Sequence, residues 1–264
     1  MNVLITGAAG GIGAAAVDLF LTRGWRVYAL DVVPVLARDG VVPLCADVTV
    51  ESALGTAVET LSAEGIVLDA MVLTAGIHRM ASLVEADADT LCRVMQVNVV
   101  GTMQTVRAFH PLLAERGRIV IVTSEVATLA PLPFNGLYSI SKAALESYAQ
   151  ALRQELGLLS QTVVTVRPGA VATTLCADSL SHTEHLTRQT VLYRKQARHF
   201  LSLTKSFMGQ PITPDRLAPV LYRAATAKHP RLSYSKHRNL GLVLLGVLPL
   251  RLQCCLIKAL LNRK

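Results

Sequence analysis

The feature that most constrains this chain is a short apolar run followed at once by closely spaced glycines. Residues 2–5 read as a strand, and Gly7, Gly11 and Gly13 separate it from a helical pattern that starts at Ala14. Glycine lets the backbone turn tightly there and lets amide N–H groups approach a pyrophosphate at the start of the helix. Glycines at this spacing also form ordinary tight turns, but a strand before them and a helix after them favour a dinucleotide site.

Short apolar runs alternate with longer helical patterns along the chain. The predicted strands are Val3–Ile5, Arg26–Leu30, Ala70–Thr74, Arg118–Thr123 and Val163–Val166, and the predicted helices are Ala14–Thr22, Ala88–Leu113, Leu137–Leu158 and Asp215–Ala227. This alternation predicts a parallel sheet, and strands as apolar as residues 119–122 are typical of a sheet covered on both faces. The sequence therefore predicts an α/β fold with a doubly wound parallel sheet, the Rossmann fold, in one domain that spans residues 1–264.

Residues 176–212 interrupt this pattern. A polar stretch leads into a segment that mixes apolar and basic side chains: Leu192, Phe200, Leu203 and Phe207 with Arg194, Lys195, Arg198 and Lys205. We expect a helical flap at the carboxyl edge of the sheet, where open α/β folds bind ligands. Together with the C-terminal tail, this flap would form an apolar, positively rimmed entrance for a lipophilic substrate.

The tail, residues 240–264, begins with an apolar run of 11 residues that is too short to span a bilayer, which needs about 20. Beyond it, Arg251, Lys258 and Asn262 form one helical stripe, and Leu252, Leu256 and Leu260 form another. The pattern predicts an amphipathic C-terminal helix. We expect the tail to cover a hydrophobic substrate cleft or a subunit interface, with peripheral membrane contact as the alternative.

Basic side chains are concentrated in the C-terminal third. The net charge is +8, but residues 1–180 carry 11 Lys and Arg against 16 Asp and Glu, whereas residues 181–264 carry 15 against 2. An anionic membrane surface or an acidic substrate fits this distribution. We expect no nucleic-acid partner, because no nucleic-acid motif is present and only 5% of the residues are aromatic.

Cysteine usage and the N-terminal residues indicate the compartment. The five cysteines are odd in number and lack the spacing of zinc ligands, so we expect reduced thiols and no metal site. The first predicted strand starts almost at Met1 and leaves no room for a cleavable leader. These features predict a cytoplasmic protein.

Asp31 indicates which dinucleotide is preferred. It ends the second predicted strand, 18 residues after Gly13, where a carboxylate can hold a ribose diol. The same carboxylate would repel a 2′-phosphate, so the sequence favours NAD, with NADP less favoured. Arg38 in the following loop is the residue that would favour NADP, and Asp31 as a simple turn residue is the alternative.

Tyr138 and Lys142 are four residues apart and fall on the same face of a predicted helix. A tyrosine has a pKa of about 10, and a nearby cation, helped by an oxidised nicotinamide ring, could lower it by about 1 to 3 units. A phenolate of this kind can accept the proton of an alcohol. Unrelated helix neighbours are the alternative explanation.

These motifs, taken together, resemble those of the short-chain dehydrogenase/reductase family, and they run in the family's order from Thr6 to Thr173. The resemblance implies a catalytic tetrad of Asn98, Ser124, Tyr138 and Lys142. In it, Ser124 binds the substrate oxygen, Tyr138 exchanges its proton, Lys142 binds the nicotinamide ribose and lowers the tyrosine pKa, and Asn98 positions a relay water. Each residue alone has a structural alternative, such as a strand cap for Ser124. Ser124 lies farther before Tyr138 than is usual, so Thr123 is a second candidate for its role.

The resemblance also implies a cofactor site and a substrate class. The expected cofactor-binding residues are Gly7, Gly11, Ile12, Gly13, Asp31, Asp47, Val48, Ala75, Gly76, Tyr138, Lys142, Pro168, Val171 and Thr173. The tail is similar to those of hydroxysteroid and retinol dehydrogenase-like members, which implies oxidation or reduction of a lipophilic, hydroxysteroid-like substrate, such as a bile acid, in a homodimer or homotetramer. The alternatives are a reductase of smaller carbonyl or acyl ketone compounds and a non-catalytic dinucleotide-binding regulator.

Overall fold

The structure is a computed structural model that describes residues 1–207 and 210–263. The side chains of residues 205–207 are not described either. The expected roles of Lys205 and Phe207 in the flap therefore lie outside the described residues.

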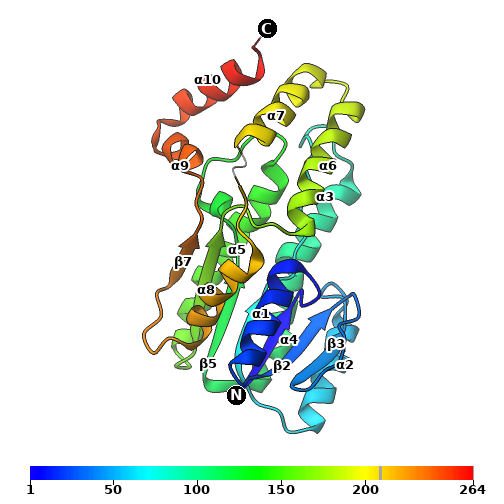
Figure 1. Cartoon of the computed structure of the whole chain (residues 1–264), viewed down its shortest axis with the longest axis vertical. Coiled ribbons are helices and arrows are strands. Elements are labelled where there is room, and N and C mark those ends of the chain that lie inside the picture. Colours follow the sequence, from blue (N-terminus) through cyan, green and yellow to red (C-terminus); the bar gives the residue numbers. More distant parts are fainter. Residues whose placement is uncertain (208–209, 264) are drawn as a thin grey trace.

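A seven-stranded, wholly parallel sheet with the order β3-β2-β1-β4-β5-β6-β7 forms the centre of the fold (Figure 1). The strands are β1 Asn2–Thr6, β2 Arg26–Asp31, β3 Val41–Cys45, β4 Leu68–Leu73, β5 Leu113–Val122, β6 Thr162–Pro168 and β7 Ser233–Lys236. The order reverses between β1 and β4, and ligands of open α/β sheets bind outside the carboxyl ends of the strands at such a point. The predicted doubly wound fold is confirmed.

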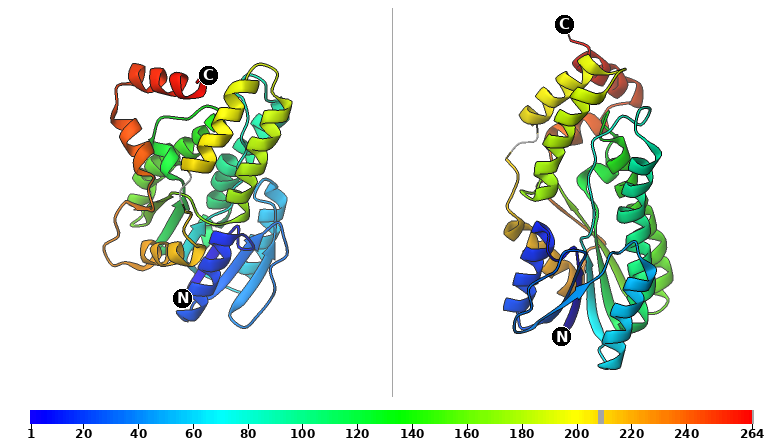
Figure 2. Two further views of the ribbon diagram at one scale, coloured as in Figure 1. Left: turned by 45° about the horizontal axis from the view of Figure 1, so that its top comes forward. Right: turned by 90° about the vertical axis from the view of Figure 1, so that its right-hand side faces the viewer.

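Helices cover both faces of the sheet (Figure 2). The α-helices are α1 Gly11–Thr22, α2 Glu51–Ala63, α3 Ala88–Met95, α4 Gly101–Phe109, α5 Gly136–Gly157, α6 Thr174–Gln189, α7 Arg194–Phe207, α8 Pro214–Thr226, α9 Leu240–Val247 and α10 Leu250–Leu261. Alternate strand residues face opposite layers, so Leu4 packs in the cluster with α2, α4 and α5, whereas Val3 and Ile5 pack in the cluster with α1 and α8. Both clusters are buried, which accounts for strands that are apolar on both sides.

Three elements of the sheet region were not predicted. Strands β3 and β7 lie at the two edges, where strands tolerate residues that interrupt an apolar run. Pro43 stands in β3, and β7 consists of the polar segment Ser233–Lys236. Helix α2 was also missed, although Leu54, Ala57 and Leu61 recur on its buried face.

The predicted helix Ala88–Leu113 is not one regular α-helix. A π-helical segment, η1 Gln96–Val100, separates α3 from α4, and a 3₁₀ turn, η2 His110–Leu112, ends the helical stretch. Strand β5 then starts at Leu113, five residues earlier than predicted. The π segment matters for the site because it carries Asn98.

The flap and the tail lie together beyond the carboxyl ends of the strands (Figure 1). The flap consists of α6 and α7, and the tail consists of α9 and α10, of which α10 lies beside α7 and contacts it. His199 Nδ1 on α7 lies 2.9 Å from the Leu261 carbonyl oxygen, and Gln196 Nε2 donates to Asn262 Oδ1 at 2.7 Å. Within the described residues, no helix combines the length and the apolar character that crossing a membrane requires.

Candidate active site

A cavity of about 960 Å³ opens at the carboxyl ends of the central strands. Its walls come from the glycine loop after β1, the segments that follow β4, β5 and β6, the flap and the tail. The cavity brings together the expected cofactor-binding residues and three members of the expected tetrad: Ser124, Tyr138 and Lys142. Asn98 does not line it.

The glycine loop has the geometry that requires glycine. Gly7 has a φ of +67°, and a Cβ on Gly13 would lie 2.0 Å from the Gly7 carbonyl oxygen. Any side chain at residue 13 would therefore push helix α1 away from the loop. Gly10 caps α1 without a side chain, and no acidic residue stands in its first turn, so the helix N-terminus is suited to an anion.

Asp31 lies beside this loop at the end of β2. Its Oδ2 accepts a hydrogen bond from the backbone N–H of Ala9 at 2.9 Å, and its Oδ1 accepts one from Val33 at 3.0 Å. Arg38 forms an ion pair with Asp18 and does not line the cavity. The carboxylate is therefore held at the cavity, whereas the guanidinium that would bind a 2′-phosphate is paired with Asp18 outside the cavity lining.

Asp47 and Val48 follow β3 and line the same end of the cavity. Burial alone would raise the pKa of the Asp47 carboxyl, but hydrogen bonds from Thr49 and the Arg93 charge outweigh burial and lower it. The Arg93 guanidinium lies 3.6 Å from Asp47 and also lines the cavity. The Asp47 carboxylate is thus an ionised hydrogen-bond acceptor at this end of the cavity, with the Arg93 charge beside it.

Ser124 and Tyr138 both line the cavity. Ser124 follows β5 in an extended conformation, and its side chain is close enough to the Tyr138 hydroxyl group to lower the pKa of that group. The neighbouring Thr123 donates instead to Glu146 Oε1 at 2.5 Å and to the Val166 carbonyl at 3.3 Å. The structure therefore favours Ser124, and not Thr123, for the role beside the tyrosine.

Lys142 is close to Tyr138, but the pKa values differ from the expectation. The Lys142 Nζ atom lies 5.7 Å from the centre of the Tyr138 ring and donates to the Val122 carbonyl at 3.1 Å. Burial raises the pKa of Tyr138 to about 12, although the Ser124 hydrogen bond lowers it, and burial lowers the pKa of Lys142 to about 8. The expected depression of the tyrosine pKa is thus not produced by the protein alone. Tyr138 is partly accessible from the cavity, and water there reduces the effect of burial on its pKa.

Asn98 has a supporting position in the π segment. Its Oδ1 accepts from the Ile77 N–H at 2.8 Å, and its Nδ2 donates to the Ile77 carbonyl and to Ser141 Oγ, both at 2.9 Å. These bonds fasten the segment after β4 to helix α5. A Cβ on Gly76 would lie 3.2 Å from Asn98 Oδ1 and 3.5 Å from Lys142 Nζ, so Asn98 also fixes the wall beside the lysine.

Residues 1–184 match the model of the family described as short chain dehydrogenase. The chain belongs to the short chain dehydrogenase family. This is a family of NAD(P)-dependent oxidoreductases, and the described residues around the cavity fit a nicotinamide dinucleotide through the glycine loop, Asp31 and Lys142.

Curated dehydrogenase relatives match most of the chain. It is 29% identical over 240 residues to "Probable oxidoreductase EphD" of Mycobacterium bovis, covering 86% of this chain and 40% of that protein. It is 32% identical over 182 residues to a 1-hydroxy-2-glutathionyl-2-methyl-3-butene dehydrogenase of Rhodococcus, covering 67% of this chain and 80% of the relative. The chain thus spans about 40% of the length of the EphD protein.

Solved dehydrogenase structures share the fold. A short chain dehydrogenase from Burkholderia cenocepacia in complex with NADP has a TM-score of 0.70 at 24% identity, covering 99% of this chain and 98% of that one. A short chain dehydrogenase family protein from Francisella tularensis has a TM-score of 0.74 at 21% identity, covering 89% and 96%. The match to the Burkholderia cenocepacia structure covers nearly the whole chain and therefore includes the flap.

The segment 168–173, which starts at the last residue of β6, lies next to the glycine loop. Pro168, Val171 and Thr173 line the cavity, and a Cβ on Gly11 would lie 2.7 Å from the Thr173 methyl group. Thr173 also caps α6, because its side chain accepts a hydrogen bond from the Cys176 N–H at 3.3 Å. The turn therefore joins the dinucleotide end of the cavity to the flap.

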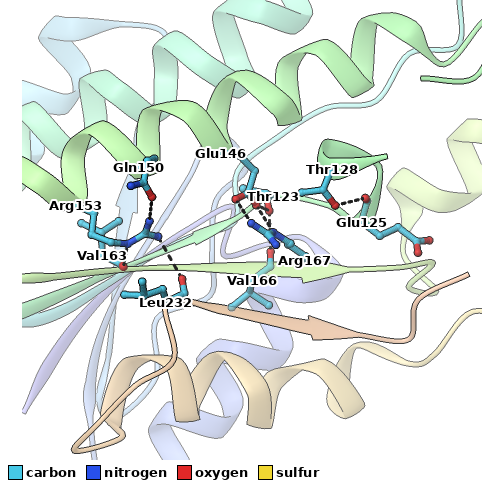
Figure 3. Close-up of polar contacts among 10 residues, drawn as sticks. All are labelled: Thr123, Glu125, Thr128, Glu146, Gln150, Arg153, Val163, Val166, Arg167 and Leu232. Carbon is cyan, nitrogen blue, oxygen red and sulfur yellow. Dashed lines mark hydrogen bonds and ion pairs between the residues drawn. The ribbon is translucent and has the colours of Figure 1, made fainter. Parts of the chain in front are cut away.

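Two supporting residues were not identified from the sequence: Glu146 and Arg167. Arg167 donates to Glu146 Oε1 at 2.8 Å and to Oε2 at 2.6 Å, and Thr123 completes the cluster (Figure 3). Burial alone would raise the pKa of Glu146, but Arg167 and Thr123 lower it. The cluster ties α5, which carries Tyr138, to β5 and β6 immediately beside Ser124. Glu146 lies four residues after Lys142 on α5, and this spacing, which places both side chains on one face of the helix, could have identified Glu146 from the sequence.

His78 and Glu125 also line the cavity and were missed. His78 Nε2 lies 2.9 Å from Asn135 Oδ1, and its ring meets the Tyr138 ring edge-on with centres 4.5 Å apart. Burial lowers the pKa of His78 to about 4, so the ring is neutral near pH 7. Glu125 accepts from the backbone N–H of Asn239 at 2.7 Å, which fastens the start of the tail to the site.

The substrate end of the cavity differs in detail from the expectation. Phe200 and Leu203 of the flap line it, but Leu192 is exposed and does not. The basic residues Arg194, Lys195 and Arg198 are exposed and lie outside the lining, so they do not form its rim. Arg238, at the start of the tail, lines the cavity instead.

Proposed function

We propose that the protein interconverts a secondary alcohol and a ketone on a lipophilic substrate, with NAD as the preferred dinucleotide. The observation that carries this proposal is the shared cavity, which joins Ser124, Tyr138 and Lys142 to the glycine loop at one end and to apolar flap and tail residues at the other. Such a cavity can hold a dinucleotide and a substrate side by side.

The chain's own residues supply orientation and proton exchange. Ser124 and Tyr138 are close to each other and both line the cavity, so one substrate oxygen can contact both hydroxyl groups. A bound nicotinamide ring supplies the acceptor or donor of a hydride. Tyr138 then takes the alcohol proton during oxidation or returns it during reduction. Because its pKa is raised to about 12, the hydroxyl group is protonated at neutral pH, as reduction requires, and oxidation depends on high pH.

Support for a lipophilic substrate comes from a hydrophobic cluster that joins the flap, the tail and the segment before α5. Phe134, Leu186, Phe200 and Leu261 are buried together, with Ile257 and Leu203 packed against them. On α9, Leu242 and Leu245 face the cavity. We therefore favour a bulky substrate such as a hydroxysteroid, and the carboxylate of a bile acid would meet Arg238 at the mouth.

Support for NAD comes from Asp31, whose carboxylate is held beside the glycine loop, and from Arg38, which pairs with Asp18. The five cysteines are all free thiols in the described residues, as suits a reducing compartment such as the cytoplasm. We also propose a homodimer or homotetramer, in line with the family resemblance.

Two adjacent leucines of α9 test the substrate proposal. Leu245 lines the cavity, whereas Leu244, on a different face of the same helix, is 69% exposed and lies outside the lining. Losing about 60 Å² of apolar contact costs about 1.5 kcal/mol, or roughly tenfold in binding. We expect Leu245→Ser to raise KM about tenfold for a hydroxysteroid and to leave KM for a small secondary alcohol within about twofold.

Leu244→Ser is the matched control and should leave both KM values unchanged. Removal of the chain after Arg238 should reproduce the selective rise in KM more strongly. Equal KM changes for both substrates, or no change with either variant in folded protein, would remove the support for a lipophilic substrate. The runner-up, a reductase of smaller carbonyl or acyl ketone compounds, would then be favoured.

A further inference from the structure

The tail has a second apolar surface, and all of its residues except Leu240 lie outside the cavity lining. Its exposed large residues are Leu240, Leu244, Val247, Leu250, Leu252 and Leu256. We call this set the outer tail face. On α9 its members recur at i, i+4 and i+7, which places them on one side of the helix, and Val247 is 79% exposed.

This arrangement differs from the amphipathic pattern expected from the sequence. On α10 the residues turned toward the protein are Gln253, Ile257 and Leu261, of which Gln253 and Leu261 are buried. Leu252 and Leu256, which the sequence placed on the apolar stripe, are exposed instead. The tail therefore has an inner apolar side that lines the cavity and an outer apolar side that the described residues leave exposed.

Charge identifies what would cover the outer tail face. After Asp215 the chain contains no Asp or Glu, whereas residues 216–264 contain 10 Lys and Arg. Two of them, Arg251 and Lys258, are exposed on α10 and lie seven residues apart, hence on the same side of that helix. An apolar face flanked by cations is the pattern of a helix that lies in the headgroup region of an anionic bilayer.

A second copy of the chain suits this surface less well. A symmetric dimer formed through the outer tail face would bring the same basic segment against itself, and like charges in contact oppose association. Crossing the bilayer is also excluded for the described helices by their length and polarity. A lipid surface satisfies both the apolar side chains and the positive charge.

We propose that the outer tail face docks the protein on the surface of an anionic membrane. Leu244 and Val247 enter the boundary between headgroups and acyl chains, and Arg251 and Lys258 contact lipid phosphates. Leu240 belongs both to this face and to the cavity lining. Docking therefore brings the cavity mouth to the membrane surface, where a lipophilic molecule is concentrated. The docking itself does not depend on which substrate is turned over.

Vesicle co-sedimentation of the full chain tests this proposal. The vesicles are phosphatidylcholine alone and phosphatidylcholine with phosphatidylserine. We expect the protein to bind the anionic vesicles and expect this binding to weaken as salt is added. Binding to phosphatidylcholine alone should be at least tenfold weaker, because each basic residue near an anionic surface adds attraction. Leu244→Asp/Val247→Asp and, separately, Arg251→Gln/Lys258→Gln should each reduce binding to the anionic vesicles at least tenfold.

The matched control is Leu158→Asp, which changes an exposed leucine at the end of α5, far along the chain from the tail. It should leave vesicle binding unchanged. Turnover of a water-soluble substrate should stay the same in the two tail variants, which separates docking from catalysis. The proposal is overturned if wild-type protein ignores anionic vesicles, if both tail variants bind as wild type does, or if the variants only convert a dimer to monomers without changing vesicle binding.

Discussion

Replacing Tyr138 with Phe should abolish turnover and spare nucleotide binding. The substitution removes only the hydroxyl group that Ser124 contacts and leaves the ring packed against His78. General acid–base catalysis typically contributes about 10²- to 10⁴-fold, so kcat should fall by at least about a hundredfold. The measurement is steady-state kcat with NAD, together with the Kd for NADH from fluorescence titration.

The pH dependence provides a second readout for the same variant. Because burial raises the pKa of Tyr138 to about 12, the phenolate is scarce at neutral pH, and oxidation by the wild type should accelerate as pH rises. The residual rate of Tyr138→Phe should not show this rise. Tyr148→Phe, in the same helix but outside the cavity lining, is the control and should behave as wild type. A folded Tyr138→Phe protein with near-normal kcat would rule out this mechanism.

NAD should be preferred over NADP by more than tenfold in kcat/KM, which corresponds to about 1.4 kcal/mol. The physical reason is the Asp31 carboxylate, which is held beside the glycine loop by the Ala9 and Val33 N–H groups and, in the proposed function, would face a 2′-phosphate of like charge. Asp31→Asn keeps the size of the side chain and removes its charge. It should reduce the preference to within about threefold, mainly by improving the use of NADP.

Arg38→Gln is the companion variant for this cofactor prediction. Arg38 pairs with Asp18, so its loss should leave the NAD to NADP ratio unchanged. If the wild type prefers NADP and Arg38→Gln abolishes that preference, then the guanidinium leaves Asp18 to clamp the phosphate and the assignment to Asp31 is wrong.

The central part of the fold could be predicted from the sequence because its strands are buried on both faces. Residues 119–122 of β5 are apolar without interruption, and that pattern has few interpretations. The edge strands were not predictable in this way, since β3 contains Pro43 and β7 is polar. The break in the helix at η1 depends on the bonds of Asn98 to Ile77 and Ser141, which are tertiary contacts.

For the site, the spacing of residues predicted proximity but not electrostatics. Tyr138 and Lys142 are close because they are four residues apart on α5, as expected. The direction of the Tyr138 pKa shift depends instead on the burial of its hydroxyl group, which no local pattern records. The tail shows the same limit, because a leucine stripe on α10 does not reveal which side faces the protein.

The most direct test of the central claim follows the absorbance of reduced nicotinamide with the wild-type chain and a panel of secondary alcohols and ketones. The panel runs from small alcohols to hydroxysteroids and is tested with both dinucleotides. We expect NAD-dependent turnover that is fastest, in kcat/KM, with the bulky apolar substrates and that is lost in Tyr138→Phe. Tight binding of the dinucleotide with no turnover of any substrate, in either direction, would contradict the account and favour a non-catalytic dinucleotide-binding regulator.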